Sequence, residues 1–147
     1  MLKVPTSQFA NSSFAIIEIN NSLLMQCRDS KKKIWYPSML GLFGGQIEKN
    51  ENRLMALRRE IKEETNLLIK SFLFINSFKI KVKNKYYNRY VYSCKIDCLP
   101  KTFKVNEGVG FKLIPKEKLH KYKKLIIPTD YVSISNYLRV NHNHYLL

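Results

Sequence analysis

The stretch that decides the fold is residues 45–67, GQIEKNENRLMALRREIKEETNL. Residues 51–65 of this stretch contain no Pro or Gly, and strong helix formers dominate, so a helix is predicted there. At about 100° per residue, Leu54, Leu57 and Ile61 lie on one face of that helix. The predicted helix therefore has an apolar side that can pack against a core.

Three carboxylates crowd a neighbouring face of the same helix, at Glu60, Glu63 and Glu64. Like charges at i, i+3 and i, i+4 repel one another, so a bound cation is expected there. Clustered hard oxygen ligands suit Mg²⁺ or Mn²⁺, which also bind phosphate oxygens. For the helix alone, the alternative is a solvated acidic face balanced by nearby basic residues, namely Arg58, Arg59 and Lys62.

Acidic residues are concentrated in this part of a strongly basic chain. The net charge is +15, and the chain has 11 Asp and Glu in total. Nearly half of them lie in or just before the predicted helix: Glu48, Glu51, Glu60, Glu63 and Glu64. Solubility does not require such a distribution, whereas a metal site does.

The spacing of these residues resembles the Nudix box, the signature of the Nudix hydrolases, which is G-x5-E-x7-R-E-U-x-E-E-x-G-U with U aliphatic. The matching residues are Gly45, Glu51, Arg59, Glu60, Ile61, Glu63, Glu64 and Leu67. Asn66 replaces the last glycine. Asn is the usual second choice for the left-handed conformation after a helix end, so the cap geometry is expected to survive.

The resemblance implies a fold and an activity. The implied fold is the Nudix fold, of class α/β (α+β), a mixed β-sheet sandwiched between helices in an α/β/α arrangement. We expect it to form a single domain over residues 1–147. The implied activity is that of a Nudix-type pyrophosphohydrolase, an Mg²⁺- or Mn²⁺-dependent enzyme. It would cleave a diphosphate bond in a nucleoside diphosphate linked to another moiety, such as a nucleoside triphosphate, a sugar nucleotide or a dinucleotide.

The resemblance also implies roles for the box residues. The metal ligands would be the carbonyl of Gly45 and the carboxylates of Glu60, Glu63 and Glu64. In the family the box arginine, here Arg59, commonly orients a glutamate through an ion pair. Arg59 and Glu63 are spaced i, i+4, and Glu51 would approach Arg59 if the preceding loop folds back. We interpret Glu51 and Arg59 as supports of the metal ligands.

A further carboxylate often comes from a loop after the central strands in this family. Glu107, in Asn106-Glu107-Gly108, is the candidate, with Asp97 as the second choice because it ends a predicted strand. The general base is then Glu107 or a glutamate of the box.

The part of the substrate beyond the phosphates is expected to contact aromatic and basic side chains outside the box. A base can stack on an aromatic ring, and arginine can bind phosphate with two hydrogen bonds. The substrate-binding candidates are Arg28, Trp35, Tyr36 and Arg89. Packing within the core or the sheet is the alternative role for the aromatic residues.

Alternating apolar residues and turn signals predict the remaining elements. Strands are expected at residues 13–19, 22–28, 71–83, 86–98 and 110–114, with turns at Asn20-Asn21 and Asn84-Lys85. Helices are expected at residues 116–122 and from 128 to about 140, followed by a frayed tail.

The net charge of +15 has three interpretations: a nucleic-acid partner, a polyanionic small substrate, or codon bias in a chain rich in Lys, Asn and Ile. The first supports an alternative function, a Nudix pyrophosphohydrolase directed at RNA 5′ ends. Its further support is a set of lysines on one predicted strand face, at positions 79, 81, 83 and 85. A non-catalytic nucleotide-sensing Nudix domain is the other alternative. Such domains tend to lose box glutamates, and none is lost here.

Several features concern location and assembly. No apolar run is long enough to span a membrane, and the N-terminus lacks the apolar region of a signal peptide, so a cytoplasmic protein is expected. The three cysteines, Cys27, Cys94 and Cys98, lack a zinc-site pattern and are expected to be buried or half-buried thiols. The sequence does not determine the oligomeric state, and a homodimer stays open.

Overall fold

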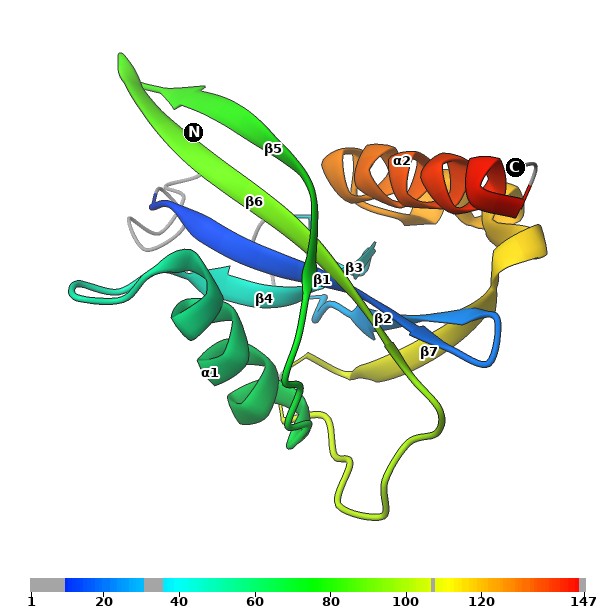
Figure 1. Cartoon of the computed structure of the whole chain (residues 1–147). Coiled ribbons are helices and arrows are strands. Elements are labelled where there is room, and N and C mark those ends of the chain that lie inside the picture. Colours follow the sequence, from blue (N-terminus) through cyan, green and yellow to red (C-terminus); the bar gives the residue numbers. More distant parts are fainter. Residues whose placement is uncertain (1–9, 31–35, 107, 146–147) are drawn as a thin grey trace.

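A mixed β-sheet forms the centre of the computed structural model, which describes residues 10–30, 36–106 and 108–145 (Figure 1). Its seven strands are β1 (Ser12–Ile19), β2 (Ser22–Cys27), β3 (Leu40–Gly41), β4 (Phe43–Gln46), β5 (Leu73–Val82), β6 (Lys85–Ile96) and β7 (Gly110–Pro115). The strand order is β3-β2-β1-β6-β5, with β4 also paired to β1 and β7 to β2. The sheet is mixed because β1 and β6 run parallel and the other pairs are antiparallel.

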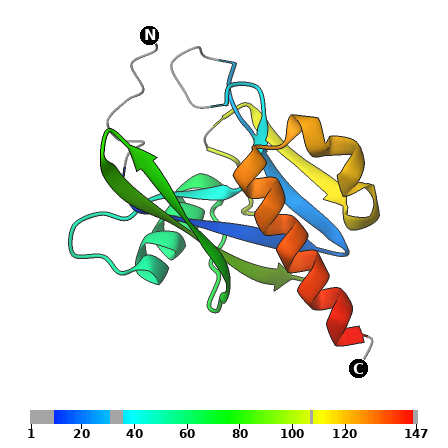
Figure 2. The ribbon, with the colours of Figure 1, turned by 90° about the horizontal axis from the view of Figure 1, so that it is seen from above.

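Two α-helices cover opposite faces of this sheet, α1 (Arg53–Thr65) on one side and α2 (Pro128–Tyr145) on the other (Figures 1 and 2). Side chains alternate between the faces along a strand. On β1, Ala15 therefore packs in one apolar cluster with Leu57 of α1, and Ile16 in the other with Ile134 of α2. The predicted α/β/α arrangement is confirmed.

Helix α1 begins at Arg53, two residues later than predicted. The side chain of Asn52 accepts a hydrogen bond from the Met55 N–H (2.8 Å) and caps the helix. At the other end Asn66 adopts the left-handed conformation (φ 61°), and its N–H donates to the Lys62 carbonyl. The expected role of Asn66 as the helix cap is confirmed.

The two hairpin turns differ in how well the sequence predicted them. Asn20 and Asn21 both have positive φ (47° and 64°), as in the turns that join twisted strands, and this turn is confirmed. In the β5–β6 hairpin the residues with positive φ are Lys83 and Asn84 (47° and 66°), one position before the predicted turn.

This shift changes where the lysines of the hairpin lie. Lys85 pairs with Val82 across the two strands, and directly opposed residues project to the same face. Lys79 and Lys81 alternate with Val82 on β5 and project to the other face. The prediction of a single face with all four lysines is therefore wrong: Lys85 belongs to the opposite face, and Lys83 lies in the turn.

Other differences have local causes. The sequence analysis predicted no strand at β3 or β4. A glycine pair, Gly44 and Gly45, lies in β4, and glycine is a poor indicator of strand. Residues 116–122 were expected to form a helix; the structure has a 3₁₀ helix, η2 (Lys116–Leu125), which is longer. Helix α2 continues past residue 140 into the expected tail, a segment without Pro or Gly to end it.

The cysteines and the helices bear on the remaining expectations. All three cysteines are free, but Cys98 is exposed, so the expectation of buried or half-buried thiols is wrong for that residue. Burial raises the pKa of Cys94 to about 12. In the part of the chain that the structure describes, no helix has both the length and the apolarity needed to span a membrane.

Candidate active site

Arg59 joins helix α1 to the loop that precedes it. Its Nε and Nη2 donate to both carboxylate oxygens of Glu51 (2.8 and 2.9 Å), and Nη2 also donates to the Gln46 carbonyl (2.9 Å). Its Nη1 donates to Glu60 (2.9 Å) and Glu63 (3.3 Å) on its own helix. The loop thus folds back onto α1 as the sequence analysis required, and one guanidinium orients three carboxylates.

These contacts shift the pKa values of both partners. The hydrogen bonds from Arg59, followed by the backbone N–H of Glu48, lower the pKa of Glu51. The same pairing, chiefly with Glu51, raises the pKa of Arg59. Glu51 is therefore held as a carboxylate and Arg59 as a cation.

Glu60 lies directly against the backbone of Gly45. A Cβ added at Gly45 would lie 2.5 Å from Cδ of Glu60 and 2.7 Å from each of its carboxylate oxygens. Only a residue without a side chain leaves room for this carboxylate beside β4. The requirement for glycine at the start of the box thus has a physical cause in this chain.

Glu64 is buried on the same helix, with 2% of its surface exposed. Its Oε2 accepts the N–H of Gly44 (3.2 Å), which is directed away from the β1 ladder. Gly44 has φ of 148°, and a Cβ there would lie 2.2 Å from the Ser13 carbonyl oxygen. Both glycines of the pair therefore allow a close approach, Gly44 to β1 and Gly45 to α1.

The end of α1 also holds the segment before β7. Asn106 donates from its backbone N–H to the Glu64 carbonyl and from its side chain to the Glu63 carbonyl, both at 2.8 Å. The candidate Glu107 lies outside the described residues, but its neighbour is tied to the acidic end of the box helix. The second choice, Asp97, follows the far end of β6, seven residues beyond Tyr90, which pairs with Ser13. Asp97 is exposed there and does not share the site.

The carboxylate oxygens of this cluster are the donor type that a hard divalent cation prefers. The carboxylate of Glu60 lies beside Gly45, that of Glu64 accepts a hydrogen bond from Gly44, and Glu63 lies on the exposed side of the same helix. No three Asp, Glu, His or Cys side chains among the described residues converge with metal-binding geometry. Two of the three candidate ligands, Glu60 and Glu63, are instead engaged by Arg59.

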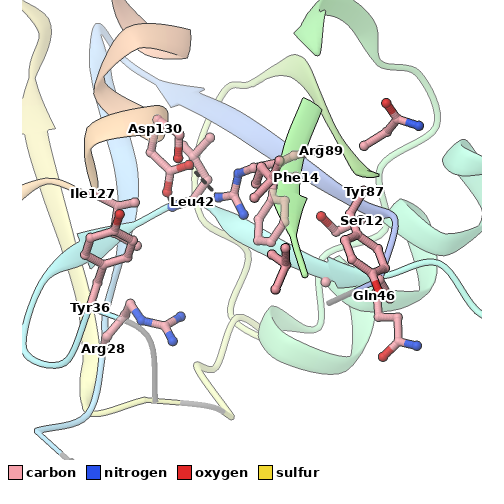
Figure 3. A pocket seen from close by; sticks show the side chains of 16 residues that line it. Ser12, Phe14, Arg28, Tyr36, Leu42, Gln46, Tyr87, Arg89, Ile127 and Asp130 are labelled. Carbon is pink, nitrogen blue, oxygen red and sulfur yellow. Dashed lines mark hydrogen bonds and ion pairs between the residues drawn. The ribbon is translucent and has the colours of Figure 1, made fainter. Parts of the chain in front are cut away.

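A pocket of about 380 Å³, drawn with its lining residues in Figure 3, includes residues of β4. Gly45 and Gln46 border it, so the backbone of β4 adjoins both the pocket and Glu60. Its lining is mainly apolar and aromatic, with a few polar groups, as is usual for sites that bind small molecules. The pocket lies on the α2 face of the sheet: Arg89 shares a face of β6 with Val91, which lies in the apolar cluster of Ile134 of α2, and Phe14 packs against the same cluster.

The structure brings three of the four predicted substrate-binding residues to this pocket. Arg28, Tyr36 and Arg89 line it, and Trp35 lies outside the described residues. Sequence reasoning missed Asp130 and Phe14. Asp130 is fully buried and accepts hydrogen bonds from Arg89 (2.5 Å) and from the Leu42 N–H (3.0 Å), while the Arg89 guanidinium stacks on Phe14. Acidic residues are common in the first turn of a helix because they interact favourably with the helix dipole. The sequence therefore contained no sign that Asp130 would bind Arg89 in a pocket.

Comparisons with known proteins concern the family and the fold of this chain. The family model for the NUDIX domain matches residues 10–132. A search of curated proteins finds no match. Many solved structures share the fold, including the MutT protein from Methanosarcina mazei Go1 (17% identity, TM-score 0.75, covering 96% of this chain and 99% of that one).

For two further similar structures, a ligand or an activity of the other protein is known. One is the NUDIX domain of Shewanella oneidensis NrtR complexed with ADP ribose (11% identity, TM-score 0.70, covering 88% of this chain and 86% of that one). The other is a C. elegans Ap4A hydrolase in a binary complex (15% identity, TM-score 0.68, covering 91% of this chain and 98% of that one). The match over residues 10–132 shows that this chain belongs to the Nudix family, as an enzyme of the pyrophosphohydrolase type.

Proposed function

We propose that this enzyme is a divalent-metal-dependent hydrolase that cleaves a diphosphate bond in a nucleoside diphosphate linked to another moiety. The observation that carries the proposal is the position of Gly45. It borders a pocket large enough for a small ligand and lies against the Glu60 carboxylate of the box helix. A diphosphate at this strand would have its non-phosphate part in the pocket and its phosphates at the carboxylates.

The proposed metal ligands are Glu60, Glu63 and Glu64, with a backbone carbonyl of the glycine pair. The carbonyl of Gly45 was the predicted one. Paired antiparallel residues alternate between those that exchange ladder hydrogen bonds and those that do not. The N–H of Gly44 goes to Glu64 and not to β1, so Gly45 is the residue expected to exchange bonds with Ser13. By the same alternation the carbonyl of Gly44 has no ladder partner on β1, which makes it the second candidate.

When bound, Mg²⁺ or Mn²⁺ would neutralise charge on the phosphate oxygens and polarise the bond to be cleaved. The protein side chains have separate tasks. Arg59 holds Glu60 and Glu63 in place through its hydrogen bonds, and the Arg59–Glu51 pair fixes Arg59 itself. A glutamate then accepts a proton from the attacking water. Glu107 and the box glutamates are the candidates for this base.

The proposed substrates are small nucleotide derivatives: nucleoside triphosphates, sugar nucleotides or dinucleotides. The related structures with ADP ribose and the Ap4A hydrolase support this class, as do the size and largely apolar lining of the pocket. We further propose that residues 1–147 act as a single domain and that the enzyme is cytoplasmic. RNA 5′ ends are the weaker alternative, since the lysines that suggested it do not share a face.

A hydrolysis screen over a nucleotide panel with Mg²⁺, with identification of products, tests this function. Glu64→Gln and Glu63→Gln should each lower kcat by at least about a hundredfold, the scale expected for lost electrostatic stabilisation of the transition state. Glu117→Gln, at an exposed glutamate of η2, is the matched control and should retain the parental rate. Near-parental turnover by either box variant would show that the ligand assignment is wrong.

A further inference from the structure

Ser13 carries a buried hydroxyl that makes no hydrogen bond within the described part of the chain. The residue is 0% exposed, and its Oγ is itself buried. Ser133 is equally buried, but its hydroxyl donates to Asn76 Oδ1 (3.0 Å), which is the usual situation for a buried polar group. A buried donor without an acceptor is costly. The hydroxyl of Ser13 therefore requires an explanation that the packing of the core does not provide.

Ser13 lies on the face of β1 that α1 covers. Side chains alternate along a strand, and Ala15, two positions later, packs with Leu57 of α1. Ser13 pairs directly with Gly45 of β4, and opposed residues of an antiparallel pair have Cβ positions about 4.5–5.5 Å apart on one face. The carboxylate of Glu60 occupies the Cβ position of Gly45, with its Cδ 2.5 Å from that point. The Ser13 hydroxyl and the Glu60 carboxylate thus occupy neighbouring positions.

The donor that orients Glu60 in the structure is a cation. Nη1 of Arg59 donates to Oε1 of Glu60 (2.9 Å) and also to Glu63 (3.3 Å). A divalent cation held by the same carboxylates is repelled by this guanidinium, because both are positive. A neutral donor can hold a metal-bound carboxylate without that repulsion, and carboxylates that bind metals are themselves hydrogen-bonded as a rule. A serine hydroxyl is such a donor.

We propose that Ser13 is a positioning residue for Glu60, and that its hydroxyl donates to the Glu60 carboxylate when a divalent cation is bound there. The proposal rests on the proposed function, which supplies the cation. It gives the hydroxyl opposite effects under two conditions. Without the cation the unpaired hydroxyl lowers the stability of the fold, and with the cation it strengthens binding.

The test compares Ser13→Ala with the parent, in the absence of any nucleotide. In EDTA the Tm of Ser13→Ala should be higher by roughly 2–4 °C, because a methyl group replaces a buried hydroxyl without a partner. The Kd for Mn²⁺ should rise by about tenfold or more, the usual effect of removing a group that supports a metal ligand. Electron paramagnetic resonance of free Mn²⁺ gives this Kd. A purely structural role would not raise the Tm and weaken Mn²⁺ binding together.

Ser133→Ala is the matched control. It also removes a fully buried serine hydroxyl, but one that has a partner, and Ser133 lies in α2 on the opposite side of the sheet from α1 (Figure 1). Its Tm in EDTA should therefore fall by roughly 2–4 °C, because the Asn76 side chain loses its donor. Its Kd for Mn²⁺ should equal that of the parent.

A double-mutant cycle tests whether Ser13 acts through Glu60. In a Glu60→Ala protein the acceptor is gone, so adding Ser13→Ala should change the Mn²⁺ Kd by less than about twofold, the scatter expected for uncoupled sites. In a Glu63→Ala protein the acceptor is present, and Ser13→Ala should have its full effect. A tenfold effect of Ser13→Ala that persists in Glu60→Ala would refute the proposal.

The outcomes separate this proposal from the proposed function. A lower Tm of Ser13→Ala in EDTA, or a Kd for Mn²⁺ equal to that of the parent, would overturn the role of Ser13 and leave the proposed function standing. If the parent binds no Mn²⁺, both are wrong. If Ser13→Ala shows both expected changes but no nucleotide derivative is hydrolysed with Mg²⁺, the proposed function fails and the role of Ser13 stands.

Discussion

Replacing each glycine of the pair with alanine should separate catalysis from stability. In Gly45→Ala the new Cβ would lie 2.5 Å from Cδ of Glu60 and 2.7 Å from its oxygens. These atoms are the end of a side chain, so they can move, and a shift of about 1 Å restores ordinary contact. The main loss is the hydrogen bond between Glu60 and Arg59, which corresponds to about 0.5–1.5 kcal/mol of unfolding free energy.

A small loss of stability should accompany a large loss of activity in this variant. For a chain of this size, about 1 kcal/mol lowers Tm by roughly 2–4 °C. A displacement of about 1 Å at a positioned catalytic group can reduce the rate by about a hundredfold. Gly45→Ala should therefore stay folded at 25 °C but hydrolyse its substrate at about 1% of the parental rate.

Gly44→Ala should behave in the opposite way. Its Cβ would lie 2.2 Å from the Ser13 carbonyl oxygen and 2.6 Å from Phe14 Cα, and φ of 148° is unfavourable for any residue except glycine. Backbone atoms cannot move aside without separating β4 from β1. Backbone strain and overpacking together should cost roughly 2–6 kcal/mol, a large part of the usual 5–15 kcal/mol of a domain.

Urea denaturation followed by circular dichroism gives the stability of both variants, and phosphate release gives their rates. A Gly45→Ala protein with the full parental rate would refute the reasoning, because Glu60 could then move without consequence. Equal unfolding free energies for the two variants would refute it as well, since the contact with backbone would then be no worse than the contact with a carboxylate.

Three further predictions concern the cap, the ion pair and the lysines. Asn66→Gly should change stability by no more than about 1 kcal/mol, whereas Asn66→Val should have a clearly lower Tm, because valine disfavours the left-handed conformation. The pKa of Glu51 is lower in the folded protein than its ordinary value of 4.5, so the ionised Glu51 stabilises the fold above about pH 4.5. This stabilisation is lost as the pH falls through the lower pKa of the folded state. The Tm of Glu51→Gln should therefore decline less than that of the parent between about pH 5 and pH 3. Changing Lys79 and Lys81 to Gln should alter kcat/KM for a nucleotide only modestly, as exposed charges are screened by salt; a loss of about two units of salt slope in RNA binding would instead favour an RNA substrate.

The sequence by itself determined the helix α1, its acidic face and the family. Local rules were enough here, because i, i+3 and i, i+4 spacing places Glu60, Glu63 and Glu64 together on any regular helix. The cap at Asn66 followed from backbone preference alone. The turn at Asn20-Asn21 was also local, since two asparagines tolerate positive φ.

The sequence was a less reliable guide where a shift of one residue changes which face of the sheet a side chain occupies. The β5–β6 turn lies one position earlier than predicted, and because side chains alternate along a strand, that shift separates Lys85 from Lys79 and Lys81. The glycine pair had no strand signal, yet it forms β4 because β1 supplies its hydrogen-bond partners. Pairing with a distant strand outweighs the weak local preference of glycine.

The pocket was decided by the tertiary structure alone. Arg89 was a candidate from its residue type, but Asp130 lies 41 positions further along the chain. The two meet at the pocket, which residues of β6 and of the first turn of α2 both line, and Phe14 of β1 supplies the ring beneath the guanidinium. A sequence pattern reports neighbours within one element, whereas the donors and acceptors that select a ligand come from elements that only the packed sheet and helices bring together.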